Sequence, residues 1–394
     1  MIWLSLIIPL VFVVIALVFF TKKIAWFEAI IPFISTLIVV LIFKYAGISS
    51  LTHDKEYLGY HIIKINYYEP WNEWITMTCT RSVPCGTDKD GNTQWCTETY
   101  DCSYCQHHSE EWSVILNSSK EKNISQTYYN YLKQKFGTKS YFVDMNRDYY
   151  TEDGDCYSND WNGSEVSYED YIIDRSYENR VQASASIFNF PNVDTSEFRK
   201  YSLYDYPKFS GIDGTKLKPI LHPKTFQVSE STQRKFEIIN GTLGIKKQVR
   251  VWILIYDNKD RNASFLQRSL WKGGNKNEFI ITIGLDKEKK VDWVEIITWG
   301  EKKMLDVRVK DYLIESDSTQ LNLDKFAPFL YKEIDQHWVR KSFKDFEYLN
   351  INPPNWAIIT SFIVSIISCL FIFFWSISNE FDMDGNKEYG RYRY

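Results

Sequence analysis

The chain has 394 residues, of which 46 are basic and 50 are acidic, and its formal net charge is −4 at pH 7. Because the acidic and basic residues are nearly equal in number, the chain creates no field that would attract a polyanion. A nucleic-acid-binding function is therefore excluded. Aromatic residues make up 17% of the chain, and their large side chains can supply the buried area of a water-exposed domain.

Three apolar segments predict membrane-spanning helices. They cover residues 2–20, 24–43 and 356–377. At the helical rise, about 20 apolar residues are long enough to cross a hydrocarbon core. Because residues 21–23 alone separate the first two segments, we expect a helical hairpin at residues 1–45. A cleaved signal peptide is the alternative for the first segment, but a basic region before it and a small-residue cleavage site after it are both missing.

Basic residues near the ends of these segments predict the orientation. They lie in the hairpin connection and in the tail at residues 378–394, at Lys22, Lys23, Lys387, Arg391 and Arg393. The positive-inside rule places both groups in the cytoplasm. The sequence therefore predicts a protein of the plasma (inner) membrane, in contact with the lipid bilayer, whose N-terminus and central domain lie outside and whose C-terminus is cytoplasmic.

Glu28 is the acidic residue within the apolar segments. An intramembrane carboxylate is a candidate for ion or proton handling. The alternative is a structural role, since Glu28 lies about one turn past Lys23, where a salt bridge or the positive end of the helix dipole would stabilise it.

Six of the seven cysteines lie between the second and third apolar segments, at Cys79, Cys85, Cys96, Cys102, Cys105 and Cys156. An even number in an extracytoplasmic region predicts disulfides, and the crowding of five within residues 79–105 favours a stapled loop or hairpin with little core of its own. Zinc is the alternative, because Cys102 and Cys105 form a C-x-x-C that is followed at once by His107 and His108.

Residues 46–224 are predicted to form a β-rich, cysteine-containing extracytoplasmic region. Between residues 57 and 80, Tyr, Ile and Trp alternate with polar residues, which predicts a strand, a break at Pro70 and a second strand. Residues 176–189 are compatible with a short helix. We expect a domain boundary near residue 225.

Residues 225–352 show the periodicity of an α/β domain. Helices are expected at residues 228–239, 263–271, 302–313 and 323–346, and strands at residues 247–256, 278–285 and 291–298. The strands are continuously apolar, which is typical of a sheet covered by helices on both faces. The fold class is therefore a membrane-anchored α+β protein.

This order of elements, followed at once by a membrane anchor, resembles the TPM domain, a small α/β module often exposed outside a membrane. The resemblance rests on RVWILIYDN, WKGGNKNE, FIITIGLD and HWVRKSFKDFEYL. Some TPM domains are described as phosphatases or calcium binders that use acidic residues on loops at strand ends. The resemblance implies a candidate site for calcium or magnesium at Asp257, Asp260, Asn275, Asn277 and Asp286. The alternative is that these are turn residues, since Asp and Asn hydrogen-bond their own backbone.

Longer segments resemble an uncharacterised family of membrane-anchored proteins encoded by tailed phages and some bacteria. They are EYLGYHIIKINYYEPWNEW, SYENRVQASASIFNF, YSLYDYP, KKQVRVWILIY and GGNKNEFIITIGLD. A family without an assigned activity implies no catalytic residues.

Two functions remain from the sequence. None of the six histidines lies in a G-x-S-x-G or similar motif, and the phosphate-binding G-x-x-x-x-G-K-S/T is absent. The leading hypothesis is a non-catalytic protein that presents its outer domain to an envelope protein or to another copy of itself, with no cofactor. The alternative is a cation-dependent, TPM-like phosphohydrolase acting at the Gly/Asn loop.

Overall fold

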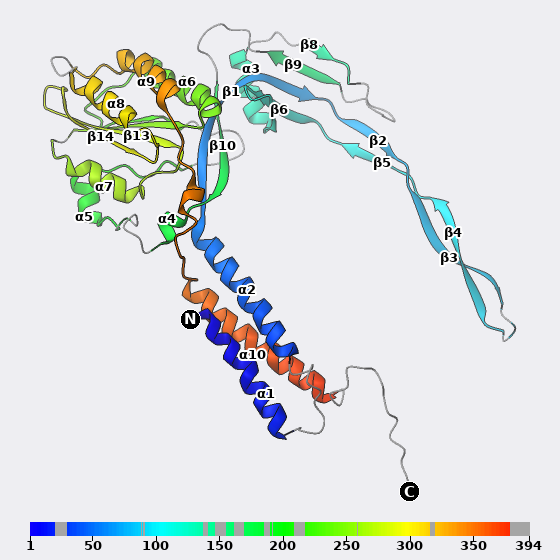
Figure 1. Cartoon of the computed structure of the whole chain (residues 1–394). Helices are drawn as coiled ribbons and strands as arrows, with labels where there is room; N and C mark the ends of the chain where they lie inside the picture. The colour runs from blue at the N-terminus through cyan, green and yellow to red at the C-terminus, as the bar shows by residue number, and fades with distance from the viewer. Residues whose placement is uncertain are drawn as a thin grey trace. The chain divides into compact units, whose positions relative to one another are not determined.

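A computed structural model describes residues 1–19, 30–87, 89, 91–136, 141–145, 155–160, 169–184, 190, 192–208, 217–257, 259–315 and 320–378. The chain divides into two compact units. The first contains Met1–Glu56, Ser176–Asn192 and Ser342–Tyr394, and the second contains Tyr57–Arg175 and Val193–Lys341. Helices and strands are mixed along the chain, so the predicted α+β class is confirmed (Figure 1).

The first unit contains the apolar helices. A 3-10 turn, η1 (Ile2–Leu6), leads into α1 (Ile7–Phe19), which is followed by α2 (Ile31–Thr52) and, near the C-terminus, by α10 (Asn355–Ser378). Among the described residues, α2 and α10 are long and apolar enough to cross a membrane, whereas the first apolar helix is shorter.

The second apolar helix differs from the predicted range of 24–43, because α2 continues to Thr52. Two contacts account for the extension. The Nζ of Lys44 lies 5.0 Å from the centre of the Trp3 ring, so this cation is accommodated within the helix. A Cβ at Gly47 would lie 2.7 Å from the Cβ of Ala357, so the helices pack closely beyond Lys44. Glu28 and the start of the predicted segment lie outside the described residues.

Small polar side chains join α10 to the other helices. The hydroxyls of Ser5 and Ser361 lie 3.4 Å apart, and those of Ser35 and Ser368 lie 2.5 Å apart. Small residues of this kind allow apolar helices to approach closely, and their hydroxyls form hydrogen bonds between helices. Two contacts for each helix give the directions. α2 is antiparallel to α10, because Ser35 lies next to Ser368 and Gly47 next to Ala357. The N-terminal helix runs parallel to α10, because Ser5 lies next to Ser361 and Phe12 next to Phe373.

Outside the apolar helices, hydrogen bonds hold separate segments of the first unit together. The carboxylate of Asp54 accepts hydrogen bonds from the Tyr177 hydroxyl at 2.9 Å and from the Asn179 amide at 2.8 Å. Nη1 of Arg180 donates to the carbonyl of Glu347 at 2.9 Å. These contacts join the start of β1 (His53–Tyr68) to α4 (Arg180–Ala183) and to the turn η3 (Phe343–Phe346).

The short helix expected at residues 176–189 is therefore reduced to α4. Its first residues belong instead to β10 (Glu169–Glu178), which pairs with β1. Asn179 ends the strand and caps α4, because its side chain accepts a hydrogen bond from the backbone N–H of Gln182. Residues 185–189 lie outside the described part of the chain.

A six-stranded sheet forms the first part of the second unit. Its strand order is β7-β6-β1-β9-β8, with β10 also paired to β1. The added strands are β6 (Glu111–Leu116), β7 (Glu121–Asn123), β8 (Tyr141–Val143) and β9 (Cys156–Asp160). The helix α3 (Gln126–Phe136) packs on the sheet, where Leu132 joins a core that includes Leu58, Ile62 and Ile65.

Between β1 and β6 the chain forms a two-stranded ribbon. It consists of β2 (Trp71–Ile75), β3 (Thr78–Thr87), β4 (Thr93–Asp101) and β5 (Tyr104–His108). β2 pairs with β5 and β3 pairs with β4, both in antiparallel register (Figure 1). The predicted strand, break at Pro70 and further strand are confirmed.

A four-stranded sheet forms the other part of the second unit. It contains β11 (Ile220–Leu221), β12 (Arg250–Tyr256), β13 (Glu278–Leu285) and β14 (Val291–Thr298). The first three strands are parallel and β14 is antiparallel to β13. The bounds of β13 and β14 are those predicted. The sheet begins at Ile220, ahead of the boundary expected near residue 225.

Helices cover both faces of this sheet. They are α5 (Thr195–Lys200), α6 (Glu230–Lys246), α7 (Asn262–Leu270), α8 (Lys303–Glu315) and α9 (Leu323–His337). Residues of α6, α8 and α9 share one core with Ile253 and Ile281, whereas α7 lies in the second core with Trp252 and Ile280. The predicted arrangement of helices on both faces is confirmed.

Two helix ends differ from the prediction. α6 continues past Asn240, because the Asn240 side chain accepts from the Val251 N–H at 2.6 Å and donates to its carbonyl at 3.1 Å. α9 ends at His337 instead of continuing to residue 346. There the backbone of Trp338 becomes extended, and its indole packs edge-on against Phe279 at 5.9 Å.

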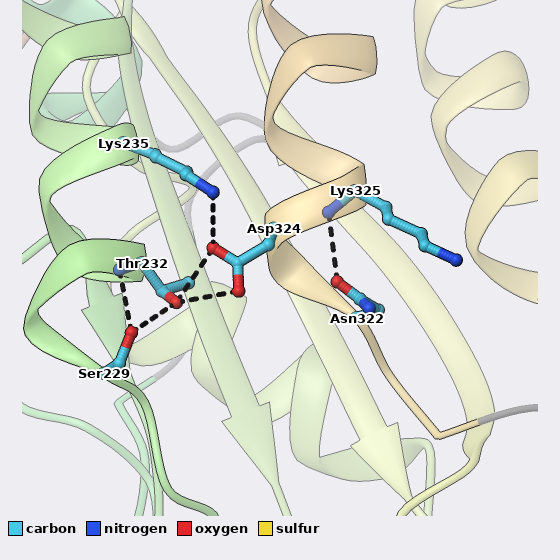
Figure 2. A network of polar contacts seen from close by, with 6 residues as sticks. All are labelled: Ser229, Thr232, Lys235, Asn322, Asp324 and Lys325. Carbon is cyan, nitrogen blue, oxygen red and sulfur yellow. Dashed lines mark hydrogen bonds and ion pairs between the residues drawn. The ribbon is translucent and has the colours of Figure 1, made fainter.

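The starts of α6 and α9 lie side by side (Figure 2). Ser229 caps α6 by accepting from the Thr232 N–H at 3.0 Å, and Asn322 caps α9 in the same way. Asp324 of α9 then accepts from the Thr232 hydroxyl at 3.0 Å and from Nζ of Lys235 at 2.8 Å. The Lys235 ammonium and the Thr232 hydroxyl hold the pKa of Asp324 below its ordinary value.

Candidate functional site

The ribbon is exposed along nearly its whole length. In β3 most side chains are exposed, and in β4 all nine are. Its geometry depends on backbone pairing, which runs from Trp71 opposite His108 to Thr87 opposite Thr93. Because an isolated two-stranded ribbon is marginally stable in water, it needs another source of rigidity.

Two disulfides supply that rigidity. Cys79 is bonded to Cys102 and Cys85 to Cys96, with Cα–Cα distances of 5.8 and 5.6 Å. Cys85–Cys96 joins β3 to β4, and Cys79–Cys102 joins β3 to the residue just after β4, so the two disulfides link the paired strands covalently. The stapled hairpin expected from the cysteine spacing is confirmed for these four residues.

The other two cysteines that were predicted to pair are free thiols. Cys105 is exposed on β5, and Cys156 is buried on β9 of the six-stranded sheet. Burial raises the pKa of the Cys156 thiol. Cys105 and Cys156 were each expected to take part in a disulfide, and that prediction is wrong for both. They lie in different sheets.

The zinc alternative does not fit the structure. Cys102 is oxidised, so its sulfur is not a thiolate ligand. His107 Nδ1 lies 2.8 Å from the side-chain oxygen of Asn72, and His108 Nε2 lies 2.8 Å from a carboxylate oxygen of Glu73. Among the described residues, no group of three or more His, Cys, Asp or Glu side chains is arranged to hold a metal ion.

The residues proposed for a cation site lie at opposite ends of the strands in the four-stranded sheet. Asp257 and Asp286 follow β12 and β13, whereas Asn275 and Asn277 precede β13. β12 and β13 are parallel, with Arg250 opposite Glu278 and Tyr256 opposite Gly284. The two asparagines are therefore separated from the two aspartates by the length of a strand, about 20 Å.

Each aspartate of the set has a local structural role. Asp286 accepts from the backbone N–H groups of Lys290 at 2.9 Å and Glu288 at 2.8 Å, which closes the turn before β14 and lowers its pKa. Asp257 is paired with Lys289 at 3.0 Å. A hydrogen bond from Thr225, followed by the contacts with Lys289, lowers the pKa of Asp257.

Asp260 and the asparagines are likewise engaged. Asp260 accepts from the Asn262 N–H and from the Tyr201 hydroxyl, both at 2.9 Å. Nδ2 of Asn277 donates to the carbonyl of Tyr57 at 2.8 Å. The side chain of Asn275 donates to the hydroxyl of Tyr206 at 3.0 Å. These contacts agree with the alternative that the Asp and Asn side chains stabilise turns and neighbouring segments.

Large aromatic side chains are exposed on the ribbon. Trp95 is 65% exposed, and Trp74, Tyr100 and Tyr104 are also exposed. Large aromatics are enriched in protein interfaces, because they bury much area for little loss of side-chain entropy. The signal in the sequence was the presence of Trp and Tyr between closely spaced cysteines, where they have no core to enter.

Comparisons with protein family models, with curated proteins and with solved structures found no match for this chain.

Proposed function

We propose that this protein is a membrane-anchored, non-catalytic protein of the cell envelope that binds a protein partner through its ribbon, residues 71–108. The observation that carries the proposal is the exposure of Trp95 and Tyr100 on β4, which disulfides at Cys96 and at Cys102, just past the end of the strand, tie to β3. A surface of this kind loses little conformational entropy when it binds, because its backbone is already ordered.

The apolar helices and the disulfides support an envelope location. α2 and α10 are long and apolar enough to serve as an anchor, and disulfides persist in oxidising compartments. The resemblance to membrane-anchored proteins of tailed phages and bacteria supports the same setting. The ribbon would then lie outside the cytoplasm.

The direction of the helices supports the proposed orientation. Phe12 of α1 and Phe373 of α10 lie 6.1 Å apart, as expected for two helices that run in parallel. The C-terminal ends of both helices therefore lie at the same end of the bundle. Each is followed in the sequence by basic residues, and the positive-inside rule places that end in the cytoplasm.

The composition of the ribbon indicates the chemistry of the partner. Residues 71–108 contain five acidic and two basic side chains, which leaves a formal net charge of −3. Arg81 is already paired with Glu98 at 2.9 Å. A partner surface with an apolar centre and a basic border would complement exposed aromatics on an acidic ribbon.

Site-specific photocrosslinking in intact cells tests this function. A photoreactive amino acid replaces Trp95 in one variant and Met304 in a matched control, which is 62% exposed on α8. We expect one discrete adduct from position 95 and none from position 304. Co-expression of two differently tagged copies separates self-association from a foreign partner, because an adduct carrying both tags identifies a second copy. No adduct at position 95, or the same adduct at position 304, would contradict the proposal.

A further inference from the structure

A row of four aromatic side chains crosses one face of the six-stranded sheet. Tyr67 of β1 is directly opposite Trp112 of β6 and Tyr157 of β9, and Tyr157 is opposite Phe142 of β8. Neighbouring ring centres lie 6.1, 6.2 and 5.6 Å apart along the row. Residues that are directly opposite in an antiparallel sheet share a face, so the row forms a continuous aromatic surface.

One face of α3 borders this aromatic row. Gln126, Tyr129, Asn130 and Lys133 follow the i, i+3, i+4, i+7 spacing, so they project from the same side of the helix. The Tyr129 ring lies 6.4 Å from that of Tyr67, and Nζ of Lys133 lies 5.9 Å from the centre of the Tyr129 ring. Tyr129 is buried, whereas the two amides and the ammonium are exposed.

Two carboxylates complete the rim. Glu69 and Glu110 lie at the two points where the chain passes between the sheet and the ribbon. The Tyr67 hydroxyl donates to Oε2 of Glu110 at 3.1 Å. Together with α3 and with Tyr67, Trp112 and Tyr157 of the aromatic row, these side chains line an open pocket of about 440 Å³. That volume is within the range of about 300–1,000 Å³ that is typical of small-ligand sites.

We propose that this pocket binds a saccharide. A pyranose ring has apolar C–H faces and a border of hydroxyls, so it needs both aromatic surface and groups that donate and accept hydrogen bonds. The pocket provides the first through Tyr67, Trp112 and Tyr157, and the second through the amides of Gln126 and Asn130 and the carboxylates. This ligand goes beyond the proposed function, since it involves the sheet and α3, and the exposed aromatics of the ribbon contribute nothing to the pocket.

Other ligand classes fit the same side chains less well. An apolar ligand would displace water from two amides and two carboxylates without offering them hydrogen bonds in return. An anion would meet Glu69 and Glu110 against the single charge of Lys133. An ammonium ligand would meet Lys133, which already occupies the position next to the Tyr129 ring. A neutral, hydroxyl-rich ligand avoids all three conflicts.

Binding to full-length protein in lipid nanodiscs tests the proposal, because detergents with sugar headgroups would compete for the pocket. The probes are chitotriose, cellotriose and maltotriose, measured by saturation-transfer NMR and calorimetry. We expect saturable binding of at least one. Asn130→Ala should weaken it about fivefold, through the loss of a hydrogen bond, and Trp112→Ala about tenfold or more.

Matched variants keep the test decisive. Trp95→Ala removes an exposed aromatic on the ribbon and should leave the affinity unchanged. If Trp112→Ala does not fold, Asn130→Ala and Gln126→Ala serve instead, because both side chains are exposed on α3. The proposal is overturned if none of the three sugars binds, if binding is insensitive to both α3 variants, or if tetramethylammonium binds where the sugars do not.

Discussion

The ribbon and the four-stranded sheet keep their strands in place by opposite means. Every residue of β12 and β13 is buried, and two apolar cores cover the faces of these strands. Every residue of β4 is exposed, and disulfides hold the ribbon. Side-chain packing therefore stabilises the sheet, whereas covalent bonds keep the ribbon rigid. The exposed side chains of β4 therefore contribute to neither of the two cores.

The largest difference should appear when one buried and one exposed apolar side chain are truncated. Ile281 is fully buried in β13, so Ile281→Ala should lower the free energy of unfolding by about 4 kcal/mol. Trp95→Ala should change it by less than about 0.5 kcal/mol, although it removes a larger side chain. Denaturant unfolding of the purified protein measures both. A cost for Trp95→Ala close to that of Ile281→Ala would show that the ribbon has a core after all.

A second prediction concerns pH and the packing of α6 on β1. His61 is buried beside Gly241, where a Cβ would lie 2.0 Å from the imidazole, and its Nε2 is 3.1 Å from the Thr242 hydroxyl. Burial, with a smaller contribution from Arg234, lowers its pKa from 6.5 to about 4. The folded protein therefore holds His61 neutral, while the unfolded chain binds a proton below pH 6.5.

Stability should accordingly fall as the pH decreases from 6.5 to 4, by about 3 kcal/mol from this residue. No such loss is expected above pH 6.5, where His61 is neutral in both states. His61→Gln removes the titration, so the difference between the two pH profiles isolates it. Parallel profiles for the wild type and the variant would contradict the assignment.

The sequence predicted the strands of the four-stranded sheet more accurately than the ends of its helices, for a physical reason. β13 is a nearly continuous apolar run and β14 is mostly apolar, and both are bounded by turn residues, so local pattern alone sets their limits. The length of α6 was not predictable in this way, because Asn240 and Gly241 usually end a helix. Here the first pairs with the backbone of β12 and the second allows His61 to approach, and both contacts are distant in sequence.

The candidate sites show the same limit. The spacing of the cysteines predicted a stapled hairpin, but pairing depends on strand register, which placed Cys156 in another sheet. Asp257 and Asn277 were grouped because both flank strands. In a parallel pair, a residue after one strand and a residue before the next lie at opposite edges. The row of Tyr67, Trp112 and Tyr157 requires the register of three separate strands, which a single sequence does not reveal.

An ion pair of the four-stranded sheet and an ion pair of the ribbon should also differ in their contribution to stability, by a smaller amount. Nζ of Lys310 donates to Glu295 of β14 at 2.6 Å, and the Glu295 side chain is 13% exposed. Glu295→Gln should cost about 2 kcal/mol, since it weakens a charged hydrogen bond in a partly buried position. Glu98→Gln removes the ribbon's pair with Arg81, in which about half of each side chain is exposed, and should cost less than about 0.5 kcal/mol. Equal costs from denaturant unfolding would argue against the difference in environment.

The smallest effect on global stability is expected from the disulfide between Cys85 and Cys96. In the double variant Cys85→Ser and Cys96→Ser, the cores of the second unit keep all their contacts, so the melting temperature should change by less than about 2 °C. The ribbon itself should lose about 3 kcal/mol of local stability, because its unfolded chain is no longer restricted by the bond between Cys85 and Cys96. Trypsin cleavage after Arg81 or Lys89 should then become about tenfold faster or more.

Cys105→Ser is the matched control, since it removes an exposed thiol and leaves both disulfides intact. If the double variant instead lowers the melting temperature as far as Ile281→Ala does, the ribbon and the sheet unfold as one cooperative unit, and rigidity in the ribbon depends on the core rather than on its covalent bonds.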